Sequence, residues 1–218
     1  MPRVVTIDGP AGAGKSTVAR RLAGDLGWRF LDTGAMYRAV TLAALRSGVD
    51  LTSDRALGDL TDRLEVSLPP GQVLLGHQDV TTAIRTVEIT EASRFVADSP
   101  AVRRRLVQWQ RDFAAGSDTV TEGRDQGTIV FPDAFRKFFL VADPEVRARR
   151  RLADLLSRGQ RATLEVVLED QHRRDARDAA RAIAPMKPAA DAVLIDTTGM
   201  TVDEVVEQLA GRIKTSVE

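Results

Sequence analysis

A glycine-rich motif, Gly9-Pro10-Ala11-Gly12-Ala13-Gly14-Lys15-Ser16, lies between a short apolar segment and a segment with helical spacing. The segment before it, Val4–Asp8, is apolar and β-branched, which is typical of a buried strand. The segment after it, Ser16–Leu26, has apolar residues four positions apart and stops before Gly27. Strand, glycine loop and helix in this order predict a P-loop in an α/β fold.

The residue types in this motif suit the phosphates of a nucleotide. Small glycines let the backbone curl, so that several N–H groups point at one anion. Lys15 adds positive charge for the β- and γ-phosphates, and the hydroxyl of Ser16 can ligate Mg²⁺. A glycine-rich turn that only joins a strand to a helix is the less favoured interpretation. We therefore expect a nucleoside triphosphate to bind at Gly9, Pro10, Ala11, Gly12, Ala13, Gly14, Lys15, Ser16 and Thr17.

The composition excludes several classes of protein. The 218 residues fit one domain, or one core with inserts, and a net charge of zero gives no general attraction to nucleic acid or anionic membranes. There is no cysteine, which excludes disulfides, thiolate catalysis and Cys-ligated metals. The longest apolar run, Phe138–Ala142, is too short to span a bilayer, and the early first strand leaves no room for a signal peptide. We expect a cytoplasmic monomer with small-molecule partners.

Strand-like segments alternate with helical patterns along most of the chain. They are Val4–Asp8, Arg29–Leu31, Thr119–Thr121, Lys137–Val141 and Ala192–Asp196. This alternation predicts the α/β class, with a parallel sheet covered by helices on both faces. Ligands of such sheets bind beyond the carboxyl ends of the strands, where this chain carries polar residues.

Two stretches break the alternation. Leu64–Leu68 and Val73–Leu75, joined by a turn with proline and glycine, predict a β-hairpin, and Val80 follows as a short third strand. The second stretch, Ala148–Ala182, is charged and poor in apolar residues. It predicts two helices, separated at Ser157-Arg158-Gly159-Gln160, that act as a flap rather than as part of the core.

The segment Leu31–Arg38 ends a strand and begins a helix. Thr33 is predicted to be the N-cap of that helix, and a helix N-terminus favours an anion. With Arg38 one to two turns further on, Thr33 could hold a second phosphate. A capped helix with a solvated arginine is an equally good interpretation.

A charged loop, Glu122–Thr128, follows another strand and contains two glycines. Buried charges need partners, and a phosphate for Arg124 with a base or sugar for Asp125 would supply them. An internal Arg–Asp ion pair is the alternative. We favour ligand binding, because clefts form at the carboxyl ends of parallel strands.

Two arginine faces border the predicted flap. Asp143 and Pro144 are suited to the N-cap and first position of its first helix. That helix carries Arg147, Arg150 and Arg151 on one face. The second helix carries Arg174, Arg177, Asp178 and Arg181. Guanidinium groups bind phosphate in a bidentate manner, whereas solvated charge faces are the usual explanation for such runs; we weigh the two equally.

These parts favour phosphoryl transfer, which needs positioning and charge neutralisation more than covalent chemistry. A phosphate-monoester acceptor is largely dianionic at neutral pH and needs no base. The many arginines and the lack of an obvious spare carboxylate therefore favour a nucleoside monophosphate kinase. A kinase for a small-molecule hydroxyl, with Asp32 as base, remains open. A P-loop switch GTPase is disfavoured, because there is no N-K-x-D motif and the D-x-x-G at Asp196–Gly199 follows the last strand.

Five motifs occur in one order along the chain: Ile7-Asp8-Gly9-Pro10, Leu31–Arg38, Gly123–Thr128, Val130–Ala134 and Arg174–Pro185. On these motifs the chain resembles the bacterial cytidylate kinases from end to end. The resemblance implies ATP-dependent phosphorylation of CMP and dCMP with Mg²⁺. It also implies a single P-loop kinase domain with a five-stranded parallel core (1–60, 115–147 and 182–218), an NMP-binding insert (about 61–114) and a helical lid (about 148–181).

The resemblance also implies roles for individual residues. Acceptor phosphate would lie near Thr33, Arg38, Arg124 and Arg181. Cytosine would lie near Arg103 and Asp125, and the sugar near Arg174 and Asp178. The group in transit would meet Lys15, Arg124, Arg150, Arg151 and Arg181. One position departs from the family, because its base-reading serine falls on Arg94 here; either Ser93 serves after a shift of helix register, or the base contact differs.

Overall fold

The computed structural model describes residues 2–157 and 159–214. Arg158 of the predicted helix break, and residues 1 and 215–218 at the ends of the predicted core, lie outside the described residues. The chain divides into two compact units, one of Met1–Phe30 with Ser117–Glu218 and one of Leu31–Gly116.

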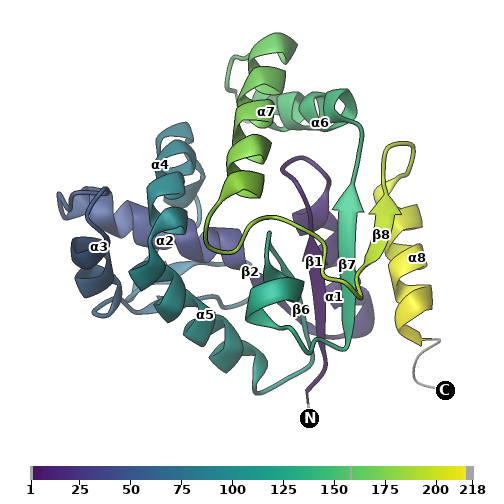
Figure 1. The fold of residues 1–218 in the computed structure, drawn as a ribbon, viewed down its shortest axis with the longest axis horizontal. Coiled ribbons are helices and arrows are strands. Elements are labelled where there is room, and N and C mark those ends of the chain that lie inside the picture. Colours follow the sequence, from purple (N-terminus) through teal and green to yellow (C-terminus); the bar gives the residue numbers. More distant parts are fainter. Residues whose placement is uncertain (1, 158, 215–218) are drawn as a thin grey trace. The chain divides into compact units, whose positions relative to one another are not determined.

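A five-stranded sheet carries the phosphate-binding loop. Its strands are β1 (Val4–Asp8), β2 (Arg29–Asp32), β6 (Thr119–Glu122), β7 (Arg136–Val141) and β8 (Val193–Asp196), in the order β2-β6-β1-β7-β8 (Figure 1). β1 runs parallel to both β6 and β7, and β7 runs parallel to β8. The predicted parallel α/β sheet is confirmed, with strand bounds within a residue of those expected.

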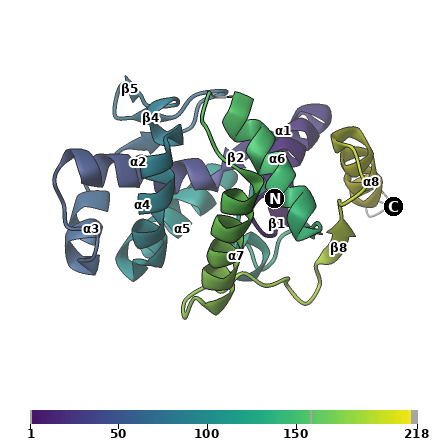
Figure 2. The ribbon, with the colours of Figure 1, turned by 90° about the horizontal axis from the view of Figure 1, so that it is seen from above.

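The helices of the first unit follow its strands. They are α1 (Lys15–Leu26), the π-helix Gln126–Val130, α6 (Pro144–Ser157), α7 (Leu164–Ala180) and α8 (Val202–Lys214). α1 and α8 pack with the sheet into one apolar core, in which Ile7 and Leu22 are fully buried. α1 ends at Gly27 in the left-handed conformation (φ 68°), as its sequence predicts. α6 and α7 lie side by side as a helical pair (Figure 2).

The second unit combines a small sheet with helices. It contains α2 (Thr33–Arg46), α3 (Asp54–Thr61), β3 (Val66–Ser67), β4 (Leu74–Leu75), β5 (Gln78–Asp79), the 3₁₀ turn Ala83–Arg85, α4 (Val87–Asp98) and α5 (Pro100–Ala114). The order β3-β4-β5 is antiparallel, as predicted for the insert. The third strand is Gln78–Asp79 rather than Val80, because a tight turn at Gly76 (φ 58°) pairs Leu75 with Gln78.

Two predicted helix ends are wrong. Asp32, not Thr33, caps α2, and its Oδ1 accepts a hydrogen bond from the Ala35 N–H at 2.8 Å. Both residue types cap helices, so sequence cannot choose between neighbours. Arg181 does not share the face of a helix with Arg174 and Asp178, because α7 ends at Ala180 and Arg181 is its C-cap.

Candidate active site

The loop between β1 and α1 needs its glycines. Gly9, Gly12 and Gly14 have φ angles of 139°, 78° and 86°, a region that other residues rarely adopt. A Cβ on Gly9 would lie 2.1 Å from the Leu140 carbonyl oxygen. A Cβ on Gly12 would lie 2.9 Å from the Arg147 carbonyl oxygen. The loop is therefore packed directly on the backbone of β7 and α6.

Lys15 is buried at the start of α1, and its Nζ donates to the Pro10 carbonyl at 2.7 Å. Burial lowers its pKa to about 7, and the nearby charge of Arg124 adds to this effect, while Glu122 opposes it. Bound phosphates would reverse the shift, because negative charge beside a buried ammonium favours the charged form. The predicted phosphate contact of Lys15 thus fits its surroundings.

Ser16 and Glu122 place two oxygens together at the end of the loop. The Ser16 hydroxyl donates to Glu122 Oε1 at 3.0 Å, and Glu122, the last residue of β6, is buried. Mg²⁺ prefers oxygen ligands and is commonly bound through one or two protein oxygens together with phosphates and water. The pair fits that ion, although Glu122 was not assigned to it from the sequence.

Asp8 reaches from the end of β1 into the loop that follows β6. Its Oδ1 accepts from the Gln126 N–H at 2.9 Å and its Oδ2 accepts from the Gly127 N–H at 2.8 Å. Burial raises the pKa of Asp8 to about 6, against the opposing effect of these two bonds. Gly127 leaves room for the contact, since a Cβ there would lie 2.9 Å from Thr6 Oγ1.

Two of the three predicted acceptor arginines, Arg124 and Arg181, meet at one carboxylate. Arg124 Nε lies 3.1 Å from Asp178 Oδ2, and Arg181 Nη2 lies 3.0 Å from Asp178 Oδ1. Burial alone would raise the pKa of Asp178, but the charges of Arg124, Arg174 and Arg181 outweigh it and lower that pKa. Arg124 therefore pairs with an aspartate of α7. The next residue, Asp125, which was predicted to contact the base or sugar, is buried, and its negative charge raises the pKa of Asp8.

The arginines of α6 have separate environments. Arg150 Nη2 donates to the Thr197 carbonyl at 2.7 Å, and Arg151 pairs with Asp154 at 2.8 Å. The predicted N-cap Asp143 is confirmed, because its Oδ1 accepts from the Glu145 N–H at 2.8 Å.

Arg147, on the same helix, faces the P-loop. Its Nη1 donates to the Ala11 carbonyl at 2.9 Å and to Asp175 Oδ2 at 2.5 Å, and its Nε donates to the Ala142 carbonyl at 3.0 Å. The Arg147 side chain is 7% exposed, so the solvated face considered from sequence is wrong at this residue.

In the second unit, Thr33 and Arg38 lie at the start of α2. Thr33 is buried, and Arg38 lies 3.6 Å from Asp32. Arg38 Nε is buried with no hydrogen-bond partner in the described part of the chain, which leaves a donor for an anion. Asp32 is engaged both as helix cap and as ion-pair partner, so it is poorly placed to act as a base.

The residues predicted to read the base lie on α4 and α5 of the same unit. Arg103 is buried, and its Nη1 donates to the Tyr37 hydroxyl at 3.4 Å. Ser93 Oγ donates to the Thr90 carbonyl at 2.7 Å, while Arg94 is exposed and its guanidinium lies 4.6 Å from the Phe95 ring centre. Both residues lie on α4, which is continuous from Val87 to Asp98.

Four residues that contact this site were not among the predicted site residues. They are Asp8, Glu122, Arg147 and Asp175. Asp8 and Glu122 end buried strands, which is a usable signal for parallel sheets. Helical spacing singled out Arg147 as part of an arginine face, but neither its contact with Ala11 nor the role of Asp175 could be found, because the partners lie far away in the sequence.

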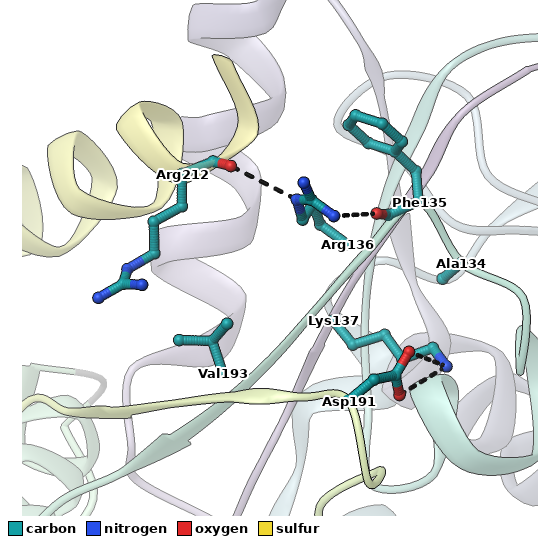
Figure 3. A pocket seen from close by; sticks show the side chains of 7 residues that line it. All are labelled: Ala134, Phe135, Arg136, Lys137, Asp191, Val193 and Arg212. Carbon is teal, nitrogen blue, oxygen red and sulfur yellow. Dashed lines mark hydrogen bonds and ion pairs between the residues drawn. The ribbon is translucent and has the colours of Figure 1, made fainter. Parts of the chain in front are cut away.

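A hollow of about 320 Å³ lies elsewhere, at the amino ends of β7 and β8 (Figure 3). It is lined by Ala134, Phe135, Arg136, Lys137, Asp191, Val193 and Arg212. In it Lys137 Nζ lies 2.9 Å from Asp191, and Arg136 donates to the Phe135 and Arg212 carbonyls. It contains none of the predicted site residues.

Within residues 2–157 and 159–214, no helix combines the length and apolar character that a bilayer crossing requires. No group of three or more histidine, aspartate or glutamate side chains there could hold a metal ion. The oxygens of Ser16 and Glu122 would depend on phosphates and water to complete a Mg²⁺ site.

Comparisons with known proteins show which family the chain is similar to. The family model described as cytidylate kinase matches residues 5–215. The chain is 44% identical to the cytidylate kinase of Rhodopirellula baltica over 99% of this chain and 94% of that protein. It is 49% identical to the cytidylate kinase of Desulforamulus reducens, covering 95% of each.

Solved structures share the fold at low identity. TT1252 from Thermus thermophilus has a TM-score of 0.53 at 18% identity and covers 100% of this chain and 98% of its own. Shikimate kinase from Bacteroides thetaiotaomicron has a TM-score of 0.51 at 14% identity, and the match covers 97% of this chain and 98% of that one.

Proposed function

Because this chain belongs to the cytidylate kinase family, we propose that it transfers the γ-phosphoryl group of ATP to CMP or dCMP, forming ADP and CDP or dCDP. One observation carries the proposal beyond family membership. The proposed donor lysine, Lys15, and acceptor arginine, Arg124, lie in one unit, where the hydroxyl of Ser16, next to Lys15, donates to Glu122, two residues before Arg124. Two phosphate-binding groups so placed suit transfer between two phosphates.

On the donor side, the residues of the loop Gly9–Ser16, with Thr17, would hold ATP. Backbone N–H groups would surround the phosphates, and Lys15 would leave the Pro10 carbonyl to contact the β- and γ-phosphates. Ser16 and Glu122 supply the oxygens that would hold Mg²⁺ beside them. When bound, that ion supplies positive charge for the phosphate oxygens.

On the acceptor side, arginines would hold the phosphate of CMP. Asp178 pairs with both Arg124 and Arg181, so little ordering of these two side chains is required on binding. In the second unit, Thr33 and Arg38 of α2 are the residues proposed for the acceptor phosphate, and Arg38 has a buried Nε that can donate to an anion. Cytosine would be read by Arg103 and Asp125 with Ser93 or Arg94, and the sugar would be held by Arg174 and Asp178.

The arginines of α6 would complete the site on closure. Arg150 and Arg151 would exchange Thr197 and Asp154 for the group in transit. These partners compete weakly with a phosphate, since those of Arg150 are the uncharged oxygens of Thr197 and Met200 and that of Arg151 is a half-exposed carboxylate. Closure would also exclude water and limit ATP hydrolysis.

The acceptor phosphate would act as its own nucleophile. A dianionic phosphate needs no general base, which fits the engagement of Asp32 and Asp8 with backbone N–H groups. We propose further that the enzyme acts as a cytoplasmic monomer. Gel filtration with light scattering measures the mass in solution, and a value of twice 23.7 kDa would refute the monomer.

A coupled assay that reports ADP formation tests the proposed function. CMP and dCMP are expected to be the best acceptors, ahead of UMP and AMP, and shikimate is expected to be inactive. Equal or better kcat/KM with AMP would contradict the cytidylate assignment. Activity with shikimate alone would revive the hydroxyl kinase with Asp32 as base, and GTP retention with slow hydrolysis would revive the switch protein.

A further inference from the structure

We propose that Asp8 and Asp175 are positioning residues whose roles are the reverse of what their sequence neighbours suggest. Asp8 directly precedes the P-loop, yet it would position the acceptor loop. Asp175 lies between the proposed acceptor residues Arg174 and Asp178, yet it would position the P-loop. The inference rests on the acceptor roles proposed above for Arg124 and Asp178.

Both carboxylate oxygens of Asp8 accept hydrogen bonds from the segment that follows Arg124 and Asp125. The two N–H groups it binds, those of Gln126 and Gly127, follow these residues immediately. Because one buried carboxylate accepts from two adjacent backbone N–H groups, it fixes both the position and the orientation of this backbone relative to β1.

The buried Gln126 side chain adds a second anchor to this loop. Its Oε1 accepts a hydrogen bond from the Thr121 hydroxyl of β6 at 2.9 Å. The loop that presents Arg124 is thus fixed to β1 and β6 from two sides. Lys15 and Asp125 are the charged groups that act on Asp8, and neither accounts for its two bonds to the loop.

Asp175 makes the matching contact on the donor side. Its Oδ1 accepts from the Ala11 N–H at 3.4 Å, while Arg147 bridges from Asp175 Oδ2 to the Ala11 carbonyl. Ala11 is therefore held at both its backbone N–H and its backbone C=O. The tight approach of Gly12 to Arg147 keeps this part of the loop against α6.

These contacts predict opposite kinetic effects for two equivalent substitutions. Asp8→Asn keeps one acceptor oxygen and turns an NH₂ group towards a backbone donor, so the acceptor loop loses its alignment. Its KM for CMP is expected to rise about tenfold or more, with less than about twofold change in the KM for ATP. Asp175→Asn is expected to raise the KM for ATP about tenfold, with little change for CMP.

Each variant serves as the control for the other, since both lose one aspartate charge in the same unit, from buried Asp8 in one case and from half-buried Asp175 in the other. Asp175→Glu, which restores the carboxylate, is expected to recover part of the ATP affinity that Asp175→Asn loses. If Asp8→Asn fails to fold, as judged by circular dichroism, Thr121→Val tests the same loop through its Gln126 anchor and should raise the KM for CMP alone.

The outcomes separate this inference from the proposed acceptor site. Arg124→Ala is measured in parallel, and an unchanged KM for CMP in that variant would refute the acceptor site itself. A raised KM for CMP in Arg124→Ala, with Asp8→Asn changing ATP and CMP equally or neither, would overturn the role of Asp8. A preferential effect of Asp175→Asn on CMP would overturn the role of Asp175.

Discussion

The carboxylate of Asp178 sets both the stability of the candidate site and the position of its arginines, and Asp178→Asn tests this. Its side chain is 9% exposed and lies between Arg124 and Arg181, whose side chains are 19% and 10% exposed. Removing one partner from a buried ion pair leaves charge without compensation, which typically costs about 3–5 kcal/mol. Because Arg124 keeps some access to water, we expect about 3 kcal/mol for Asp178→Asn.

This loss is measurable by calorimetry. For a chain of this size, a change of 1 kcal/mol shifts the melting temperature by about 2–4 °C, so Asp178→Asn should melt about 6–12 °C lower at neutral pH. The matched control is Asp170→Asn on the same helix. Asp170 pairs with Arg173 in an exposed contact, which should contribute less than about 1 kcal/mol.

The direction in which pH changes the stability contribution of Asp178 follows from its pKa. The folded-state pKa of Asp178 is lowered, so its contribution to stability is present above the unfolded-state value of about 3.9 and is lost as the pH falls through the lower folded-state value. The stability difference between the wild type and Asp178→Asn should therefore shrink only in strong acid. Equal melting of wild type and Asp178→Asn at neutral pH, or an equal loss in Asp170→Asn, would refute the reasoning.

Two further predictions follow from the loop geometry. Gly9→Ala should abolish ATP binding in isothermal titration, because the new methyl group would lie 2.1 Å from the Leu140 carbonyl oxygen. The control is Gly24→Ala on α1, whose methyl group meets nothing within 4 Å and which should bind ATP as the wild type does. Normal ATP binding by Gly9→Ala would disprove the clash. Burial raises the folded-state pKa of Asp8 from 3.8 to about 6, so its contribution to stability is fully present below the unfolded value and is lost as the pH rises through 6. In urea titrations between pH 4 and pH 7, the unfolding free energy of the wild type should fall by about 2 kcal/mol relative to that of Asp8→Asn, and parallel curves would contradict this.

The fold could be predicted from sequence because its signals are local. Short β-branched runs such as Val4–Asp8 and the glycines of the P-loop report on their own backbone, and α1 lies within one residue of its expected start. Errors arose where two neighbours compete for one position. Asp32 and Thr33 are both good caps, and Gln78 rather than Val80 forms the third strand because of a two-residue turn.

The pairing within the site could not be predicted, because it joins residues that are far apart in sequence. Arg124 was expected to bind a phosphate or pair internally, and its partner Asp178 lies 54 residues away. Helical periodicity placed Arg147, Arg150 and Arg151 on one face, yet it could not reveal that Arg147 binds the Ala11 carbonyl of the P-loop. Which arginine remains available to a ligand depends on tertiary contacts.

The engaged carboxylates bear on the choice between acceptors. A hydroxyl acceptor needs a carboxylate that can take its proton. Asp8, Asp32 and Asp175 each accept a backbone N–H, Glu122 accepts from Ser16, and Asp178 lies between two arginines. Using one of them as a base would break a contact that holds a loop or a helix end. A phosphate acceptor requires no such loss, so the likeness in fold to shikimate kinase does not extend to a shared choice of acceptor.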